Sequence, residues 1–196
     1  MKYVFFDIDF TLFDCRKFER MVFAKLKKDL FSFSLRALKK DLKAARHFIT
    51  TTPEKIDASQ LTGSFLDPAY YQKALFPDAL PALQALKNTA KLGAWSEANP
   101  KKQMIKLKLS GLINFFEPEL LYLSRRKFRL VKKIVDSCGL ENVIFVDNKP
   151  KLIKKLSGLG IQSFLIDRFN TQPAKVPTIR TLASLPDLPI LFSEKK

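Results

Sequence analysis

The sequence contains few of the residues from which disulfide frameworks and zinc sites are built. It has 2 Cys and 1 His among 196 residues, and the two cysteines, Cys15 and Cys138, lie far apart along the chain. A disulfide scaffold and a Cys-His metal site are therefore excluded, and we assign His47 no role. Only 6 glycines are present, and no glycine-rich phosphate-binding loop occurs. We expect both cysteines to be free thiols in a reducing cytoplasm.

Long apolar runs are absent as well. Crossing a bilayer requires about 18 to 20 consecutive apolar residues, and charged residues interrupt every apolar stretch before that length. The first residues also lack the layout of a secretory signal, because Asp7 and Asp9 fall where its apolar segment would lie. No repeat or low-complexity segment is present. With 46% hydrophobic residues the chain can bury a core, so we expect one cytoplasmic catalytic domain with a modest insertion.

Acidic residues are outnumbered, with 19 Asp and Glu against 35 Lys and Arg, and the net charge is +16. A field of this sign attracts anions such as phosphorylated metabolites, nucleotides and nucleic acid. Most bases fall at helical spacings that face solvent, so a solvated basic surface is the simpler interpretation. Most of the 18 phenylalanines have core spacing and do not interleave with the bases, as base-stacking residues would. We expect a small anionic phosphorylated partner, leave nucleic acid open, and derive no oligomeric state.

Two carboxylates and a hydroxyl follow the first expected strand. The apolar run 3–6 predicts a buried strand, and Asp7, Asp9 and Thr11 come directly after it. Open α/β sheets place their ligand crevices at the carboxyl ends of the strands. Two carboxylates this close repel each other unless a cation lies between them or one takes up a proton. The pair therefore suits a metal site or a nucleophile with a general acid, although Asp is also a common turn residue.

Three later strands are expected to end in polar residues too. Apolar runs at 92–95, 120–123 and 143–146 predict these strands, and each precedes an expected helix. A last strand is expected over 161–166, before a proline-containing tail of loop and short turns. The polar residues are a hydroxyl, three adjacent bases, and an acid with an amide: Ser96; Arg125, Arg126 and Lys127; Asp147 and Asn148. Each signal is generic alone, and ordinary surface charge before a helix is the alternative for the bases.

Between the first strand and the second, the pattern is helical. Two apolar stripes have helical spacing: Phe18, Met21, Val22, Leu26 and Leu30, and then Leu35, Leu38, Leu42 and Ala45. Polar residues before prolines mark helix starts along the chain, because Pro suits the first helical turn: Thr52-Pro53, Asp67-Pro68 and Asn99-Pro100. We expect an all-helical unit over 15–76, inserted into a core of 1–14 and 77–196. The alternative is that these helices simply pack on the core.

The order of these motifs resembles that of the haloacid dehalogenase (HAD) superfamily of phosphohydrolases. The shared features are Asp-x-Asp-x-Thr after the first strand, then a Ser, a base and Asp-Asn, and they span nearly the whole core. The resemblance implies an α/β fold with a Rossmann-like parallel sheet of about five strands, helices on both faces and a helical cap over 15–76. The chain departs from the family pattern at four positions. Phe10 replaces a usual Gly, Glu97 a usual Asn, and Asn148 and Leu152 replace acids.

By this resemblance the reaction is Mg²⁺-dependent hydrolysis of a phosphomonoester. Asp7 would attack phosphorus and form an aspartyl-phosphate. Asp9 would protonate the leaving oxygen and then take a proton from water. The phosphoryl oxygens would be held by Thr11, Ser96 and Lys127, with the two arginines before Lys127 as substitutes for it.

The resemblance also implies the metal ligands. Mg²⁺ would be bound by Asp7, the backbone carbonyl of Asp9 and Asn148, with Asp147 as a ligand or behind them. A neutral amide in this set predicts weaker affinity. Retention of Asp9 disfavours a dehalogenase, since cleavage of a carbon-halogen bond needs no acid there. Two other functions stay open: a phosphatase of nucleotides or nucleic-acid ends, favoured by the basic surface, and a non-catalytic binding or regulatory protein, favoured by the departures.

Overall fold

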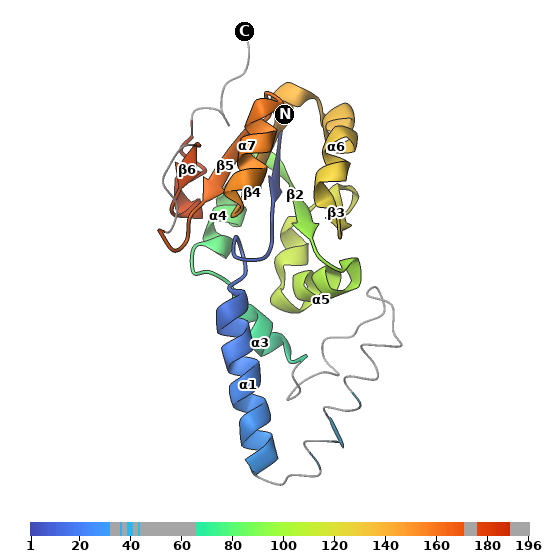
Figure 1. The fold of residues 1–196 in the computed structure, drawn as a ribbon, viewed down its shortest axis with the longest axis vertical. Coiled ribbons are helices and arrows are strands. Elements are labelled where there is room, and N and C mark those ends of the chain that lie inside the picture. Colours follow the sequence, from blue (N-terminus) through green and yellow to red (C-terminus); the bar gives the residue numbers. More distant parts are fainter. Residues whose placement is uncertain (32–35, 37–38, 41–42, 44–65, 171–175, 189–196) are drawn as a thin grey trace.

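One parallel sheet forms the centre of the molecule. A computed structural model describes residues 1–31, 36, 39–40, 43, 66–170 and 176–188. The six strands run in the order β3-β2-β1-β4-β5-β6, and every pairing is parallel (Figure 1). The strands are β1 Lys2–Phe6, β2 Ala90–Glu97, β3 Leu121–Ser124, β4 Val143–Asp147, β5 Gln162–Ile166 and β6 Thr178–Ile179. Because β1 lies between β2 and β4, the residues after β1 leave the sheet beside those after both neighbours.

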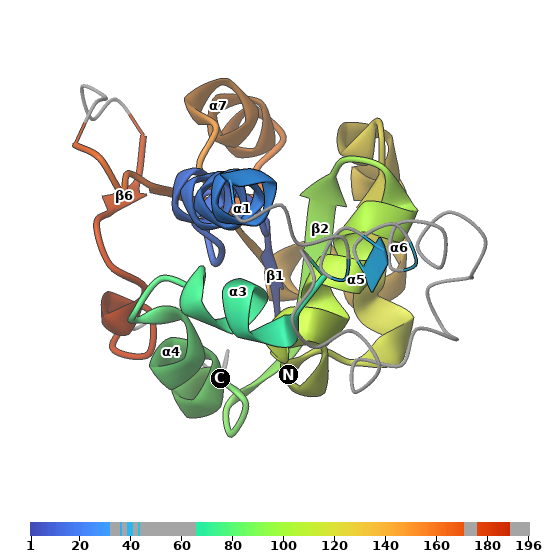
Figure 2. The same cartoon turned by 90° about the horizontal axis from the view of Figure 1, so that it is seen from below.

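Helices cover both faces of this sheet. They are α1 Cys15–Phe31, α3 Pro68–Lys73, α4 Ala79–Leu86, α5 Pro100–Ser110, α6 Val131–Cys138 and α7 Pro150–Gly158. Buried side chains of α4 and α5 share one apolar cluster, and those of α6 and α7 share another. Figure 2 shows α4 and α7 on opposite sides of β1. The α/β architecture predicted from the sequence is confirmed. None of the described helices has the length and apolarity that a membrane span requires.

Alternation along β1 divides the core between the two faces. Val4 and Phe6 belong to the cluster of α4 and α5, whereas Phe5 belongs to that of α6 and α7. Phe5 stacks on Phe145 of β4 at 5.4 Å between ring centroids. Burying a side chain of this size stabilises the fold by about 1.5–3 kcal/mol. Gly93 on β2 leaves room for the Phe5 ring, since a Cβ there would lie 2.6 Å from it.

Helix starts predicted from polar-proline pairs are confirmed where the structure describes them. The Asp67 side chain accepts a hydrogen bond from the backbone N–H of Ala69, with Pro68 in the first turn of α3. Asn99 caps α5 in the same way through Lys101 N–H, at 3.0 Å. The Thr52-Pro53 pair lies outside the described residues. These caps fix where α3 and α5 enter the structure, beside the carboxyl end of the sheet.

The structure corrects three details of the sequence analysis. The sheet has six strands, because Thr178 and Ile179 of the tail pair with Leu165 and Ile166. Two residues are too few to show an alternating pattern, so the sequence predicts a loop in this tail. The apolar spacing over 77–88 predicts a helix with Leu80 facing inward, but Leu80 is 39% exposed. A 3-10 turn over Lys127–Leu130 precedes α6, where a continuous helix was expected.

The described part of the expected cap extends from the carboxyl end of the sheet (Figure 1). The Phe18 ring of α1 packs between Phe13 and Tyr71, at centroid distances of 5.4 and 4.6 Å. Farther along α1, Leu26 is 42% exposed. The second apolar stripe lies outside the described residues. The division into core and cap therefore stays a prediction.

Candidate functional site

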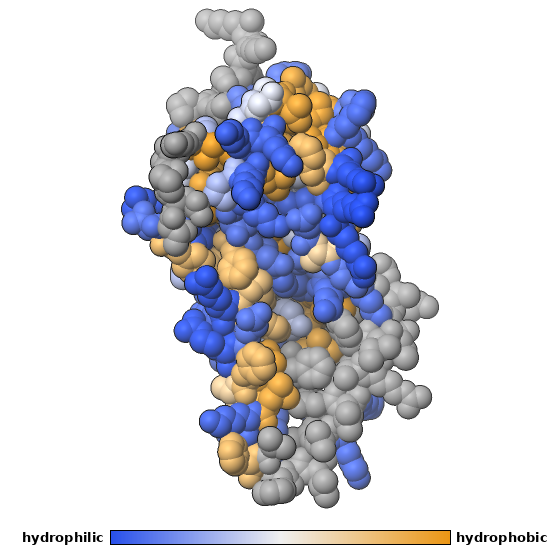
Figure 3. All heavy atoms as spheres, in the orientation of Figure 1, coloured by the Kyte–Doolittle hydropathy of each residue, from blue (hydrophilic) through white to orange (hydrophobic). Residues whose placement is uncertain are grey.

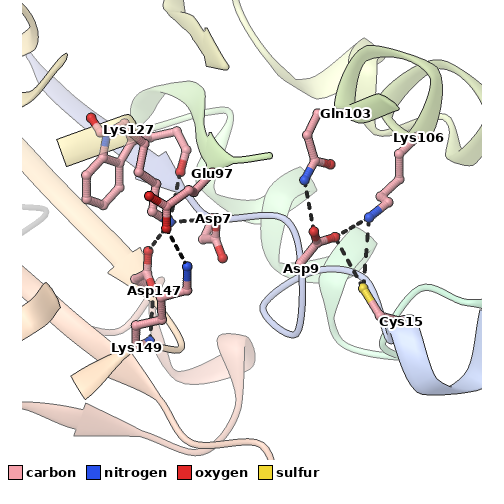
Figure 4. A network of polar contacts seen from close by, with 10 residues as sticks. Asp7, Asp9, Cys15, Glu97, Gln103, Lys106, Lys127, Asp147 and Lys149 are labelled. Atoms are coloured by element: carbon pink, nitrogen blue, oxygen red, sulfur yellow. Dashed lines mark hydrogen bonds and ion pairs between the residues drawn. The ribbon is translucent and has the colours of Figure 1, made fainter. Parts of the chain in front are cut away.

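Two buried carboxylates face one ammonium group at the carboxyl ends of β1 and β4. Asp7 continues β1, and its backbone N–H donates to Val146 O at 2.9 Å, so it leaves the sheet beside Asp147. Lys127 Nζ lies 2.7 Å from Asp7 Oδ1 and also contacts Asp147 Oδ2 (Figure 4). All three side chains are buried. The ammonium relieves the repulsion that two adjacent carboxylates would otherwise suffer.

Trp95 holds Lys127 in this position. The Trp95 indole N–H donates to the Lys127 backbone carbonyl at 3.0 Å, and the ammonium lies 4.5 Å from the centre of the indole ring. Both neighbouring bases, Arg125 and Arg126, are exposed, whereas Lys127 is 1% exposed. The structure therefore places Lys127, of the three adjacent bases, against Asp7.

Asp147 uses both of its carboxylate oxygens within the protein. Oδ2 contacts Lys127, and Oδ1 accepts the backbone N–H of Lys149 at 2.8 Å. Burial, and after it the Asp7 charge, raise the pKa of Asp147 above its usual range, and Lys127 acts in the opposite sense. With both oxygens in use, Asp147 is better placed to orient Lys127 and the turn after β4 than to bind a metal ion.

Three of the expected site residues carry a buried polar atom with no hydrogen-bond partner. These atoms are Thr11 Oγ1, Ser96 Oγ and Asn148 Oδ1, among five such side-chain atoms in the described part of the chain. Buried polar atoms nearly always have a partner, so their coincidence at one site indicates a missing ligand. Two hydroxyls suit phosphoryl oxygens, and an amide oxygen suits a hard cation such as Mg²⁺.

Conventional clusters of metal-binding side chains are absent from the described residues, which contain no group of three His, Cys, Asp or Glu placed to hold an ion. The expected set differs from such a cluster, because it uses one carboxylate, one amide oxygen and one backbone carbonyl. The partnerless Asn148 Oδ1 fits this set.

Asp9 lies in a second polar cluster, away from Asp7. Its carboxylate forms an ion pair with Lys106. It also accepts hydrogen bonds from the Gln103 amide N–H at 2.9 Å and from the Cys15 thiol at 3.3 Å. Figure 4 shows Asp9 turned toward α5, which carries Gln103 and Lys106, while Asp7 meets Lys127. Burial alone would raise the pKa of Asp9, but the Lys106 charge and the three hydrogen bonds outweigh it, and the pKa lies below its usual range. Burial raises the pKa of Cys15 to about 12, so it stays a thiol that can donate. Both cysteines are free, as expected.

A third contact joins the ends of β2 and β4. Lys149 Nζ lies 2.7 Å from Glu97 Oε2, and both side chains are partly exposed. The pKa of Glu97 is lowered, chiefly by the hydrogen bond that Lys149 donates to it. Glu97 therefore remains charged beside the site, but its charge is balanced by Lys149. The repulsion that a Glu would impose on a phosphate is reduced by this pairing.

Solved structures with the same architecture extend over nearly the whole chain, although no protein-family model and no curated protein matches the sequence. A HAD phosphatase from Thermococcus onnurineus is 21% identical, with a TM-score of 0.61 over 95% of this chain and 97% of that chain. An L-2-haloacid dehalogenase from Xanthobacter autotrophicus is 16% identical, with a TM-score of 0.60 over 96% and 98%. YfnB from Bacillus subtilis, described as a HAD-hydrolase and solved bound to magnesium, is 17% identical, with a TM-score of 0.62 over 94% and 96%.

The chain has the haloacid dehalogenase fold. Phosphatases and dehalogenases both occur among the HAD structures that it resembles, so the reaction has to be argued from the site.

The HAD motif's usual glycine has a structural reason that Phe10 makes visible. Phe10 adopts φ 60°, in the left-handed region, which costs a residue with a Cβ about 1–2 kcal/mol. The strain belongs to a tight turn in which the N–H groups of Thr11, Leu12 and Phe13 all point at Ile8 O. The turn aims the Thr11 side chain inward and sends the chain on into α1. Phe10 forms this turn despite its strained φ and carries a half-buried ring.

Sequence reasoning missed Lys106, Gln103 and Lys149. The first two occupy one side of α5, in a basic run that has the spacing of a solvated face. No local signal shows that this side of α5 meets the turn after β1, because the contact joins residues 94 and 97 positions apart.

Proposed function

We propose that this HAD-fold protein is a Mg²⁺-dependent phosphomonoester hydrolase that acts on a small phosphorylated metabolite through an aspartyl-phosphate at Asp7. The observation that carries the proposal is the joint presence of a buried Asp7 paired with Lys127 and three partnerless oxygens on Thr11, Ser96 and Asn148. A phosphoryl group with its cation would satisfy all three oxygens at once. Neither a solvated turn nor a purely structural ion pair requires them.

The metal would be held by the Asp7 carboxylate, the Asp9 backbone carbonyl and Asn148 Oδ1. When bound, Mg²⁺ neutralises charge on the phosphoryl oxygens. With Asn148 in place of an acid, the set carries one formal charge, so we expect weaker affinity than at an all-carboxylate site. Asp147 supports the set indirectly, through Lys127 and the Lys149 N–H.

Asp7 is the nucleophile in this proposal. Its carboxylate oxygen attacks phosphorus, the new O–P bond forms, and the bond between phosphorus and the leaving oxygen breaks. Lys127 pairs with the Asp7 carboxylate and, with the hydroxyls of Thr11 and Ser96, binds the phosphoryl oxygens as their charge redistributes. Water then attacks the aspartyl-phosphate and releases inorganic phosphate, which restores Asp7.

Asp9 is the proton carrier. Asp9 must first leave Lys106 and take up a proton, because its pKa is lowered while the two are paired. It then gives this proton to the leaving oxygen in the first step and takes one from water in the second. In the geometry described above its carboxylate is paired with Lys106, so this role requires Asp9 to exchange that partner for the substrate.

Phosphate release from a panel of phosphomonoesters tests the proposal. We expect Mg²⁺-dependent release by the wild type, loss on addition of EDTA, and loss by at least about 10³-fold in Asp7→Asn. Asp136→Asn, which alters an exposed carboxylate on α6, is the matched control and should retain full activity.

Two results would overturn the proposal. One is release by the wild type no faster than by Asp7→Asn across the panel, which favours the binding or regulatory alternative. The other is Asp7-dependent release of halide from 2-haloacids without phosphatase activity.

A further inference from the structure

A pocket opens beside the proposed phosphate site. It has a volume of about 280 Å³, and its lining includes Phe10, Arg16, Asn148 and Phe169. Asn148 belongs to both places, since its Oδ1 is one of the partnerless oxygens. A substrate with its phosphate at Asp7 would therefore extend its remaining atoms into this pocket. The volume lies near the lower end for small-molecule sites, which suits a ligand of one or two rings.

Two aromatic rings and a cation belong to the lining of the pocket. The Phe10 and Phe169 rings lie 6.4 Å apart at 70°, and the Arg16 guanidinium lies 4.7 Å from the centre of the Phe169 ring. Phe169 is 42% exposed, and Arg16 is exposed as well. Flat aromatic faces and guanidinium planes are the groups on which nucleobases stack.

Phe10 carries a large ring at a strained backbone position. A glycine would relieve the cost of φ 60°, yet the chain carries a large ring there. The ring is not part of the buried core; it faces Phe169 and lies 5.9 Å from the Arg16 guanidinium. The tight turn explains the backbone strain but does not require a ring, so the ring is available to a ligand in the pocket.

Arg168, another residue of the pocket lining, is paired within the protein. Arg168 lies over the Phe76 ring at 4.3 Å, makes two bonds to the Asp78 carboxylate at 2.8 and 2.6 Å, and donates to Thr11 O at 2.6 Å. Its charge is used inside the protein, so Arg16 is the guanidinium that the pocket presents to a ligand. Beyond the pocket, a groove that shares Arg16 and Phe169 continues past Arg20 and Phe23 of α1, along which hydrophobic and hydrophilic side chains alternate (Figure 3).

We propose that this pocket binds the base of a nucleoside monophosphate whose phosphate group is held at Asp7. The assignment rests on the proposed function and names its substrate class. A sugar phosphate offers no π-face to Phe10, Phe169 and Arg16, whereas a base does. Glu97 and Lys149, which pair across the ends of β2 and β4, do not line this pocket.

Kinetics on matched substrates test the assignment. We expect kcat/KM for nucleoside monophosphates to exceed that for ribose 5-phosphate by on the order of tenfold or more. Phe169→Leu keeps an apolar side chain but removes the aromatic face, and should lower kcat/KM for nucleotides on the order of tenfold, mainly through KM. The same variant should leave ribose 5-phosphate hydrolysis unchanged. Phe31→Leu, at the 71% exposed end of α1, is the matched control.

A binding measurement separates the pocket from the chemistry. Asp7→Asn protein should bind nucleoside monophosphates in equilibrium dialysis, and Phe169→Leu in that background should weaken binding on the order of tenfold. Absence of phosphate release from every substrate contradicts the hydrolase, whatever the binding result. Equal kcat/KM for ribose 5-phosphate and nucleotides, or equal losses for both in Phe169→Leu, overturns the pocket assignment and leaves the hydrolase standing. Hydrolysis of a 5′-phosphorylated oligonucleotide but of no free nucleotide also overturns it.

Discussion

A buried lysine between two buried carboxylates is the residue on which the geometry of the site depends. Lys127, Asp7 and Asp147 come from three separate elements, and each is costly to bury without the others. The sequence indicated a base near this point, but not which of three. The choice follows from the 3-10 turn, which brings the Lys127 carbonyl to the Trp95 indole, and no spacing rule anticipates that turn.

Removing this ammonium should destabilise the fold. In Lys127→Met, two carboxylates remain buried with no cation, and we expect the free energy of unfolding to fall by about 3–5 kcal/mol in urea denaturation at neutral pH. Lys132→Met, which removes an exposed partner of Asp136, should cost less than about 1 kcal/mol. Adding Asp147→Asn to Lys127→Met should restore part of the loss. A cost for Lys127→Met as small as that for Lys132→Met would show that water replaces the ammonium freely.

The contacts of Asp9 predict a dependence on the leaving group. Asp9→Asn cannot supply a proton, so kcat/KM for an alkyl phosphate should fall by about 10²–10⁴-fold. Hydrolysis of p-nitrophenyl phosphate, whose leaving group needs little protonation, should fall much less. Steady-state phosphate release with both substrates measures the two losses. Equal losses would mean that Asp9 acts only by binding, through its backbone carbonyl or its turn.

At the scale of elements, strands and helices were predicted better than their mutual contacts. Strands β1 and β4 are continuous apolar runs, and Asn99-Pro100 fixes the start of α5, so local sequence suffices for them. The short β6 and the side of α5 that meets Asp9 depend on partners far along the chain. Tertiary contacts determine the pairing of β6 and the orientation of α5, and a local sequence pattern does not predict such contacts.

The tail that forms β6 is fastened to the start of α4 by one carboxylate. Asp78 accepts hydrogen bonds from the side chains of Arg168 and Thr181 and from the Leu182 N–H, at 2.6 to 2.8 Å. Burial alone would raise the pKa of Asp78, but these hydrogen bonds and the Arg168 charge hold it below its usual range. Because the folded-state pKa is lower than the unfolded one, Asp78 stabilises the fold fully at pH values above the unfolded pKa, near about 4.

This stabilisation should disappear as the pH falls below about 4 and through the folded-state pKa of Asp78. We expect Asp78→Asn to be less stable than the wild type at pH 6 and to show a shallower loss of stability between about pH 5 and pH 3. Urea denaturation across this range measures the difference. Asp187→Asn, an exposed carboxylate in the same tail segment, is the control and should follow the wild type. Parallel curves for Asp78→Asn and the wild type would contradict the assignment.

At the scale of the whole molecule, motif order predicted the fold where no single motif could. An acid pair, a hydroxyl, a base and an acid-amide pair follow successive strands, and only a parallel sheet with β1 inside brings them to one edge. The net charge of +16 does not identify the ligand, because it favours the binding of any anion. The sequence also did not predict which aromatic residues lie beside the site. Phe10 and Phe169 are 159 positions apart, and neither lies in a run of bases.

The two carboxylates of the first motif, Asp7 and Asp9, bind partners from opposite sides of the sheet. Asp7 is held by Lys127, which leads into α6, whereas Asp9 is held by Lys106 and Gln103 of α5 on the other side. Although only Ile8 separates them, the surroundings of each can vary without disturbing the other. In the proposed reaction, substitutions confined to α5 should therefore alter proton transfer by Asp9 and leave the pairing of Asp7 with Lys127 unchanged.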